Sequence, residues 1–173
     1  MADFNLVVPF IHEKEGGFVN DPLDAGGATN MGVTLETFTH YCQSKGLPRP
    51  SVQQLRNLSE VQWQDIMRTR YWDVIQGDRI SSQSVALALM DWAVHSGPRT
   101  PIKKVQAILG VKADGIVGPV TLSAINSCSP LPLFGQIQLA RRKFLGSLVV
   151  SRPANSKFLE GWLNRVASIR FSD

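Results

Sequence analysis

Apolar residues recur along most of the chain at the spacing typical of amphipathic α-helices. In residues 4–15 they gather on one broad face when successive positions are placed about 100° apart. The members of this face are Phe4, Leu6, Val7, Val8, Phe10 and Ile11. The same pattern predicts further helices over residues 35–44, 59–71, 84–95, 101–109, 120–126, 133–150 and 157–169. No strand-period run is long enough for a sheet of ordinary size, so the predicted fold class is all-α, mostly helical.

Residues 18–33 break the helical pattern. Turn-forming residues, above all Asn20-Asp21-Pro22 and Gly26-Gly27, are interleaved there with apolar ones such as Val19 and Val33. This mixture predicts an irregular loop that contains at most a small β element. Two glycines, Gly16-Gly17, precede the loop and are expected to end the first helix.

The composition is that of a globular protein with a mild positive charge. The chain has 173 residues, of which 43% are hydrophobic and 18% are charged. Its formal net charge of +4 favours polyanionic partners such as nucleic acid, an anionic membrane or an acidic cell-wall polymer. No Lys/Arg run marks a nucleic-acid tail and no segment reaches the length of a membrane span, so neither a nucleic-acid partner nor an integral membrane segment is expected. The basic cluster Arg141-Arg142-Lys143 is interpreted as a solvated helix face.

The cysteines and histidines do not suggest a metal site. Cys42 and Cys128 lack metal-ligand spacing, and His12 and His95 have no third ligand at a matching spacing. We therefore expect neither a metal nor a cofactor. The two thiols are expected to be reduced, with a disulfide between them left open. The first residues contain no basic segment followed by an apolar stretch, so synthesis in the cytoplasm without a signal peptide is expected.

Two glutamates lie near the end of the first predicted helix. Residues two apart point to nearly opposite sides of a helix, and only Glu15 falls within about a quarter turn of the apolar centre. Glu15 is therefore predicted to be half-buried, and Glu13 to lie outside the apolar face. Burial and the partial negative charge of the helix end both disfavour a carboxylate. The protonated acid that results could donate a proton to a leaving oxygen, as a glycosidase requires.

The loop after Glu15 offers partners for such an acid, although ordinary turn formation explains its residues as well. An inverting glycosidase needs a second carboxylate on the order of 6.5–9.5 Å from the acid, with a water between the two. Asp21 and Asp24 are the acidic candidates, and Asp24 is preferred because Asp21 precedes a proline that holds it extended. Thr29 could help to position the water.

The segments Glu15-Gly-Gly-Phe-Val-Asn-Asp-Pro22 and Asp24-Ala-Gly-Gly-Ala-Thr-Asn-Met-Gly-Val-Thr34 closely resemble a known signature. It is the N-terminal signature of the N-acetylmuramidases of glycoside hydrolase family 108. That family has a Glu-Gly-Gly-Tyr motif whose glutamate is essential, and this glutamate corresponds to Glu15. Phe18 stands where tyrosine is usual, so the ring is kept and the hydroxyl is lost. The residue order is also similar to bacteriophage-type lysozymes, which implies a lysozyme-like fold with Asp24 and Thr29 holding the water.

The C-terminal part resembles the peptidoglycan-binding domain that accompanies this family. The matching stretches are Val105-Gln-Ala-Ile-Leu-Gly110, Asp114-Gly-Ile-Val-Gly-Pro119, Thr121 and Phe158-Leu-Glu-Gly-Trp-Leu-Asn-Arg-Val166. The loop at residues 114–119 is either a saccharide or peptide contact surface or a helix-connecting turn. Together the two resemblances imply a catalytic part over residues 1–97 and a helical peptidoglycan-binding part over residues 98–173, packed against it.

The end of the helix predicted over residues 84–95 adds candidates for substrate contact. Relatives of the family have a similar Asp-x-x-x-x-Ser-Gly stretch at this place, and Trp92 either stacks on a sugar ring or belongs to the core. All the substrate-binding candidates are Gly16, Gly17, Phe18, Asn30, Asp91, Trp92 and Ser96.

The resemblance implies a peptidoglycan muramidase that cuts the β-1,4 bond between N-acetylmuramic acid and N-acetylglucosamine. Glu15 would be its general acid, with Asp24 and Thr29 as catalytic partners. The alternatives are a lytic transglycosylase and a wall-binding or secretion-assisting protein without catalysis. The expected partner is the peptidoglycan glycan strand, and the enzyme is expected to be a monomer that acts in the periplasm or at the cell wall after release or export. Phage lysis as an endolysin and secretion-linked wall remodelling both remain open.

Overall fold

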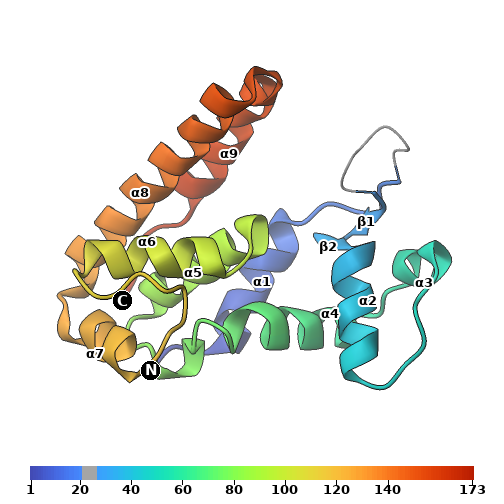
Figure 1. Cartoon of the computed structure of the whole chain (residues 1–173), viewed down its shortest axis with the longest axis horizontal. Helices are drawn as coiled ribbons and strands as arrows, with labels where there is room; N and C mark the ends of the chain where they lie inside the picture. The colour runs from blue at the N-terminus through green and yellow to red at the C-terminus, as the bar shows by residue number, and fades with distance from the viewer. Residues whose placement is uncertain (21–26) are drawn as a thin grey trace. The chain divides into compact units, whose positions relative to one another are not determined.

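The computed structural model describes residues 1–20 and 27–173 of the chain. Within these residues the chain is mostly helical, and its one sheet is a hairpin of two short strands. The expected all-α, mostly helical fold with a small β element is therefore confirmed. The chain forms two compact units (Figure 1). We call Asn5–Arg70 the N-terminal unit, and Tyr71–Asp173 together with Met1–Phe4 the C-terminal unit.

Helix α1 (Phe4–Lys14) is the first helix of the chain and ends just before Glu15. Its fully buried positions are Val7 and Ile11, which lie four residues apart on one side of the helix. Leu6 is 67% exposed, so the buried face is narrower than the broad apolar face expected from the sequence. The expectation counted every apolar residue near the face, whereas burial follows only the residues that meet a neighbour.

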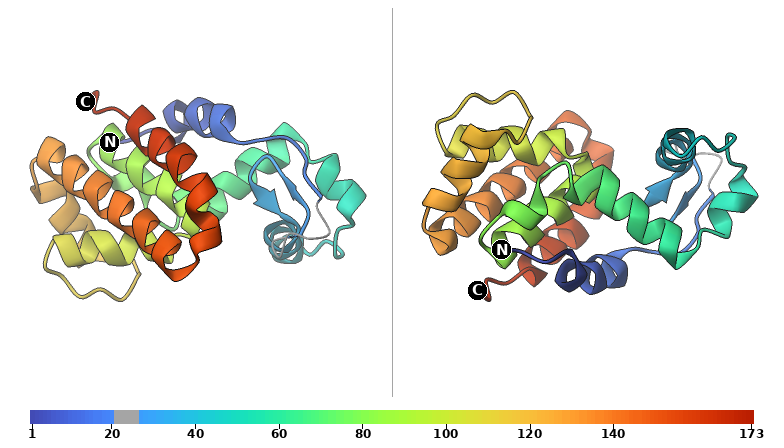
Figure 2. Two further views of the ribbon diagram at one scale, coloured as in Figure 1. Left: turned by 90° about the horizontal axis from the view of Figure 1, so that it is seen from above. Right: turned by 90° about the horizontal axis from the view of Figure 1, so that it is seen from below.

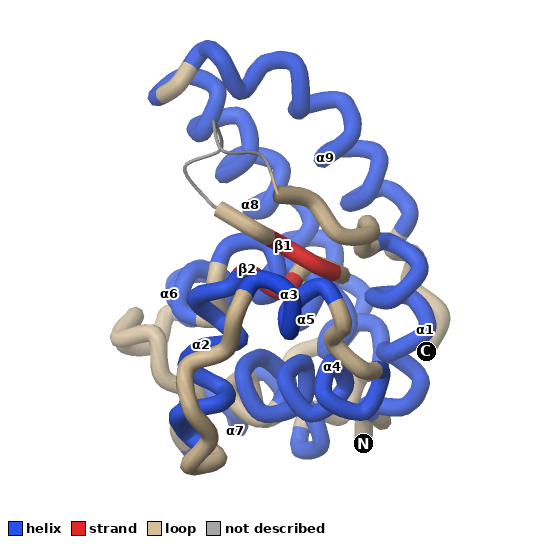
Figure 3. Tube along the Cα trace, turned by 90° about the vertical axis from the view of Figure 1, so that its right-hand side faces the viewer, coloured by secondary structure: helices blue, strands red, loops and turns tan. Residues whose placement is uncertain are grey.

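The β hairpin follows α1 and is built on a two-residue turn (Figure 3). Strands β1 (Thr29–Asn30) and β2 (Val33–Thr34) are antiparallel, with Thr29 opposite Thr34 and Asn30 opposite Val33. Val19 adds a third edge, because its N–H and carbonyl bond the carbonyl and N–H of Thr29 at 2.8 Å each. The ragged β element expected in the 18–33 loop thus includes a true hairpin that ends at Thr34.

Three helices complete the N-terminal unit, and side chains cap the start of each. Helix α2 (Leu35–Ser44) begins where the Thr34 hydroxyl accepts from the Thr37 N–H. Helices α3 (Val52–Arg56) and α4 (Glu60–Met67) each begin with a Ser/Gln capping box. Helix α3 is absent from the sequence-based expectation because five residues are too few to show a helical period.

A π-helical turn, η1 (Arg68–Trp72), continues α4 and ends the helix predicted over residues 59–71. The C-terminal unit then begins with η2 (Gly77–Arg79), a turn of 3₁₀-helix, and α5 (Gln83–Ser96). Its remaining helices are α6 (Arg99–Ile108), α7 (Pro119–Ser127), α8 (Pro130–Ser151), η3 (Pro153–Asn155) and α9 (Ser156–Ser168).

Helix α5 is the centre of the C-terminal unit. Most of its residues are buried, and it packs against α6 and α8. Helices α8 and α9 run side by side and are joined by η3, as the orange and red ribbons of Figures 1 and 2 show. No helix in the described part of the chain combines the length and the apolar character that crossing a bilayer requires.

Candidate active site

Glu15 lies directly after the last residue of α1. Its backbone N–H donates to the Ile11 carbonyl at 3.1 Å, so Glu15 keeps helical bonding although the helix ends at Lys14. The residue is half-buried, whereas Glu13 is exposed and its carboxylate pairs with Lys14 at 3.0 Å. The predicted difference in burial between the two glutamates is confirmed. Helix α1 thus presents one carboxyl group to the interior of the site and the other to solvent.

The carboxyl group of Glu15 rests against the turn of the β hairpin. A Cβ atom built on Gly32 would lie only 2.6 Å from Glu15 Cδ, too close for any real side chain. Gly32 also has a φ of +74°, a left-handed conformation that L side chains rarely adopt. The left-handed backbone therefore favours glycine at position 32, and any side chain there would have to displace the Glu15 carboxyl group.

Met31, the other turn residue, is held by the side chain of Trp63. Met31 has a φ of +50°, so both residues of the turn are left-handed, as a type I′ hairpin requires. The indole Nε1 of Trp63 donates to the Met31 carbonyl at 2.8 Å. Trp63 lies on α4 and is completely buried. The sequence reasoning missed this contact, because no local pattern links residues 32 positions apart.

The glycines after Glu15 are open to solvent. Gly16 and Gly17 are exposed, and a Cβ added to either would meet no atom within 4 Å. Helix α1 ends at Lys14, just before these glycines as expected, and neither glycine has a positive φ, so the end is not a left-handed glycine cap. The space beside them is compatible with the approach of a bulky substrate. Phe18 is half-buried next to this segment, and the guanidinium of Arg56 lies 5.1 Å from its ring centre.

The other candidate residues of the loop lie in different environments. Thr29 is half-buried in β1, where its backbone bonds Val19. Asn30 is buried, and its amide donates to the carbonyls of Leu55 and Arg56 at 2.9 and 3.0 Å. Its amide nitrogen therefore anchors α3 to the hairpin, and its expected role as a sugar contact stays a prediction. Asp24, the preferred second carboxylate, and Asp21 lie outside the described residues.

Asp91 and Trp92 belong to the core of the C-terminal unit. Asp91 is 0% exposed and Trp92 is 1% exposed, so neither can reach a sugar ring in this structure. Their expected role in substrate contact is therefore corrected: helix α5 turns them inward rather than toward a cleft. Ser96, the last residue of α5, is half-buried, and its carbonyl accepts from the Thr100 hydroxyl at 3.2 Å.

A buried ion-pair cluster surrounds Asp91. Arg141 Nη1 lies 2.6 Å from one carboxylate oxygen and Arg165 Nη2 lies 2.7 Å from the other. Burial alone would raise the pKa of Asp91, but the two guanidinium groups hold it below its usual range. Arg141 is 1% exposed, so its interpretation as part of a solvated face is wrong, although Arg142 and Lys143 are exposed as expected.

His95 lies beside the same cluster. Its Nδ1 is 3.1 Å from Arg141 Nη2. Desolvation of the imidazole and the nearby charge of Arg165 lower the pKa of His95 to about 4, while the Asp91 carboxylate opposes the shift. The histidine is therefore neutral near pH 7 and can accept from the guanidinium. In the described residues no three His, Cys, Asp or Glu side chains gather as metal ligands do.

The loop at residues 114–119 is organised by the buried side chain of Gln106. Its amide nitrogen bonds Asp114 Oδ1, the Ile116 carbonyl and the Thr121 hydroxyl at 2.9, 2.9 and 3.0 Å. Its amide oxygen accepts from the Gly115 N–H at 2.8 Å, and Gly115 has a φ of +82°. The loop is thus a built turn between α6 and α7, and Ile116 at its outer side is 68% exposed.

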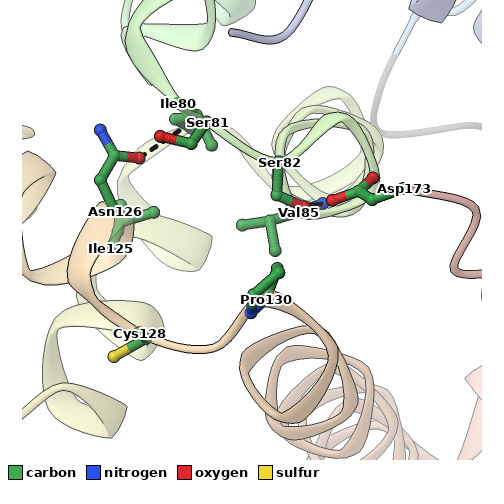
Figure 4. Close-up of a pocket in the computed structure, with 9 residues that line it drawn as sticks. All are labelled: Ile80, Ser81, Ser82, Val85, Ile125, Asn126, Cys128, Pro130 and Asp173. Carbon is green, nitrogen blue, oxygen red and sulfur yellow. Dashed lines mark hydrogen bonds between the residues drawn. The ribbon is translucent and has the colours of Figure 1, made fainter.

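A cavity of about 290 Å³ lies in the C-terminal unit near the start of α5 (Figure 4). The residues that line it are Ile80, Ser81, Ser82, Val85, Ile125, Asn126, Cys128, Pro130 and Asp173. Two of its polar side chains are used in hydrogen bonds within the protein: Asn126 bonds the backbone of Arg79 and Ser81, and Asp173 accepts from the Ser84 N–H.

The two cysteines are not paired. Cys128 is an exposed free thiol and Cys42 a buried one, so the disulfide left open by the sequence is not formed.

The surroundings of Glu15 combine a half-buried acidic residue, an open backbone segment and a left-handed turn. A half-buried carboxyl group beside an accessible segment can exchange a proton with a bound ligand. The cluster around Asp91, by contrast, is closed by its own ion pairs. The surroundings of Glu15 are therefore the candidate active site.

Comparison with known proteins identifies the two segments of the chain. Residues 8–97 match the family model described as glycosyl hydrolase 108, and residues 100–167 match one described as a predicted peptidoglycan domain. A solved structure of SagA from Brucella abortus has a TM-score of 0.82 and 33% sequence identity to the chain. The match covers 96% of this chain and 90% of that one. Among curated proteins, no significant match was found.

The two matched segments and the two compact units divide the chain at different places. The boundary between the family segments falls between residues 97 and 100, whereas the boundaries between the compact units fall after Phe4 and after Arg70. The expected parts 1–97 and 98–173 therefore remain a prediction about function rather than a description of packing. The chain belongs to the glycosyl hydrolase 108 family, and it is a peptidoglycan hydrolase in which a hydrolase segment precedes a peptidoglycan domain.

Proposed function

We propose that this protein is an N-acetylmuramidase that hydrolyses the β-1,4 bond between N-acetylmuramic acid and N-acetylglucosamine, with Glu15 as the general acid. The observation that carries the proposal is the position of the Glu15 carboxyl group. Its carboxyl group is half-buried at the end of α1, rests against Gly32, and adjoins a glycine segment that is open to solvent. Among the described residues of the site, this is the carboxyl group with both a defined position and an open approach.

In the proposed reaction, Glu15 donates its proton to the oxygen that bridges the two sugars. The bond between this oxygen and the anomeric carbon breaks, and the oxygen leaves as a hydroxyl group. A water molecule attacks the anomeric carbon from the opposite face and gives its own proton to a base. Asp24 is the proposed base, although it lies outside the described residues, and Thr29 is proposed to help hold the water. This assignment makes the enzyme inverting.

The glycan strand is proposed to approach across Gly16 and Gly17, where added side chains would meet nothing within 4 Å. Phe18, half-buried beside Arg56, is proposed to contact a sugar ring of the strand. Stacking of a ring face on an aromatic side chain does not require the hydroxyl that tyrosine would supply. The peptidoglycan domain supports the same substrate, because it would keep the enzyme on the wall polymer between cuts.

The site of action is proposed to be the periplasm or the cell wall, reached after release or export from the cytoplasm. Both an endolysin that lyses the host cell and a secretion activator that opens the wall locally fit this location. Either role needs the same bond to be cut.

Glu15→Gln tests the assignment of the acid. The amide keeps the size of the side chain but has no acidic proton, so hydrolysis of purified sacculi should fall by about 10²–10⁴-fold. Glu13→Gln is the matched control, because Glu13 lies two residues away and is exposed. It should retain wild-type activity. Full activity of Glu15→Gln, with wild-type thermal unfolding, would contradict the proposal.

Mass spectrometry of the released fragments tests the type of reaction. Hydrolysis adds one water to each cut, so the fragments should end in ordinary reducing sugars. Fragments that lack this water would instead identify a lytic transglycosylase, which would also tolerate Asp24→Ala. Binding to sacculi without any released fragment would identify a wall-binding protein without catalysis.

A further inference from the structure

Trp63 touches both elements that hold Glu15 in place. Its indole Nε1 bonds the Met31 carbonyl in the hairpin turn at 2.8 Å. Its ring also forms a T-shaped pair with the imidazole of His12 on α1, with the ring centres 5.0 Å apart and the planes at 89°. His12 is three residues before Glu15, and Gly32 of the same turn lies against the Glu15 carboxyl group. One side chain therefore connects the helix that carries the acid to the turn on which the acid rests.

The turn needs this support because its conformation is unfavourable for Met31. A residue with a Cβ atom in the left-handed region costs about 1–2 kcal/mol relative to the right-handed one. Met31 has a φ of +50°, and because it has a Cβ atom it cannot adopt this conformation without that cost, as glycine could. The bond from Trp63 fixes the Met31 carbonyl in the orientation that this conformation gives it. Without the bond, Met31 can leave the left-handed conformation, and Gly32 would move with it.

The His12 ring that packs against Trp63 is also paired with Glu60 of α4. His12 Nε2 lies 3.1 Å from Glu60 Oε2, so α1 and α4 are joined next to the indole ring. Trp63 itself is 0% exposed. Complete burial excludes contact between the indole and a sugar, so any effect of Trp63 on the reaction acts through the residues that it touches.

We infer that Trp63 is a positioning residue for the reaction: it holds Met31 in the left-handed conformation and thereby sets the place of the Glu15 carboxyl group. The inference rests on the proposed role of Glu15 as the acid. Positioning of this kind affects the bond-breaking step more than binding, because displacement of a reacting group by about 1 Å can cost 10²-fold in rate. The turn, Trp63 and Glu15 would then act together in the reaction.

Trp63→Phe tests the inference in the full chain. Phenylalanine keeps a buried ring but has no N–H, so kcat on soluble glycan oligomers should fall by about 10-fold or more, with KM little changed. Trp72→Phe is the matched control. Trp72 is also 0% exposed, and its indole also makes one hydrogen bond, at 2.7 Å to Asp78, but it lies in the C-terminal unit. This control should lose stability to a similar degree while its kcat stays within about twofold of wild type.

Met31→Gly separates positioning from simple loss of packing. Glycine adopts a positive φ without cost, so a hairpin with glycine at position 31 no longer depends on the indole bond. The fall in kcat caused by Trp63→Phe should therefore be several-fold smaller when Met31→Gly is already present. A purely structural role of Trp63 predicts the same fall in both backgrounds.

The inference is overturned if Trp63→Phe lowers kcat no more than Trp72→Phe does, or if Met31→Gly leaves the fall unchanged. Should the variant fail to fold, hydrogen exchange of the wild-type indole N–H decides, and exchange as fast as in free tryptophan would also overturn it. Failure of the proposed function would give a different result: Glu15→Gln would stay active, while the indole N–H of Trp63 would remain protected from hydrogen exchange.

Discussion

Glu15 and Gly32 constrain each other, because the carboxyl group of one fills the space that a side chain on the other would need. The sequence could indicate half of this arrangement. Helical spacing placed Glu15 near the apolar face and Glu13 away from it, and both positions are confirmed. The contact with Gly32 could not be foreseen, because it depends on how the chain returns from the loop. The burial of Asn30, Asp91 and Trp92 likewise could not be foreseen.

Replacement of Gly32 by alanine should affect the reaction as well as stability. Alanine at a φ of +74° costs on the order of 1–2 kcal/mol, and its Cβ atom must push the Glu15 carboxyl group aside. Activity on sacculi should fall by about 10-fold or more. Gly46→Ala is the matched control, since Gly46 has a φ of +69° and open space around it. It should show the same loss of unfolding free energy with normal activity, and equal activities of the two variants would refute the contact.

At the scale of elements, the cluster of Asp91, Arg141 and Arg165 ties helices α5, α8 and α9 together. Each arginine takes one oxygen of a carboxylate that is wholly removed from solvent. Periodicity predicted all three helices, and their bounds agree with the structure to within about three residues, a normal margin for helix ends. It could not predict the ion pairs, because Asp91 and Arg141 are 50 positions apart in the chain.

Asp91→Asn should destabilise the protein by about 3–5 kcal/mol, because it leaves two buried guanidinium groups without their counter-charge. Urea unfolding measures the change. Asp65→Asn provides the comparison, since Asp65 pairs with Lys45 at 2.8 Å with both side chains partly exposed. That variant should lose no more than about 1 kcal/mol.

The loss caused by Asp91→Asn should shrink in acid. The pKa of Asp91 is lowered in the folded protein, so its stabilisation is complete above the ordinary aspartate pKa, near 4, and is lost as the pH falls through the lower native value. Unfolding free energies of the two proteins should therefore converge below about pH 4. A difference that stays constant from pH 7 to pH 3 would show that the carboxylate charge is not what stabilises the cluster.

At the scale of the whole molecule, family segments and packing divide the chain differently. Helix α5 belongs by sequence to the hydrolase segment, residues 8–97, yet it packs against α6 and α8 within the C-terminal unit. Its buried side chains therefore depend on residues from the peptidoglycan domain. Within the C-terminal unit, the two family segments therefore share one core.

A fragment of residues 1–97 should consequently fail to fold on its own. It would expose the apolar surface of α5 and leave Asp91 without either arginine, because Arg141 and Arg165 are both removed. Circular dichroism should show reduced helicity and no cooperative thermal transition, whereas the full chain should unfold cooperatively in the same buffer. A fragment that melts cooperatively, with full activity on sacculi, would contradict this expectation.

The sequence alone determined what depends on neighbours along the chain. Helical spacing, capping residues and turn-forming glycines act over a few residues, so they predicted the helical fold, the small β element and the half-buried Glu15. The signature around Glu15 also indicated the family. Tertiary structure decided what depends on residues far apart: the seat of Glu15 against Gly32, the bond from Trp63 to Met31, and the burial of Asp91 between two arginines. Such contacts leave no periodic trace, because they arise only when separate elements pack and remove each other's surfaces from water.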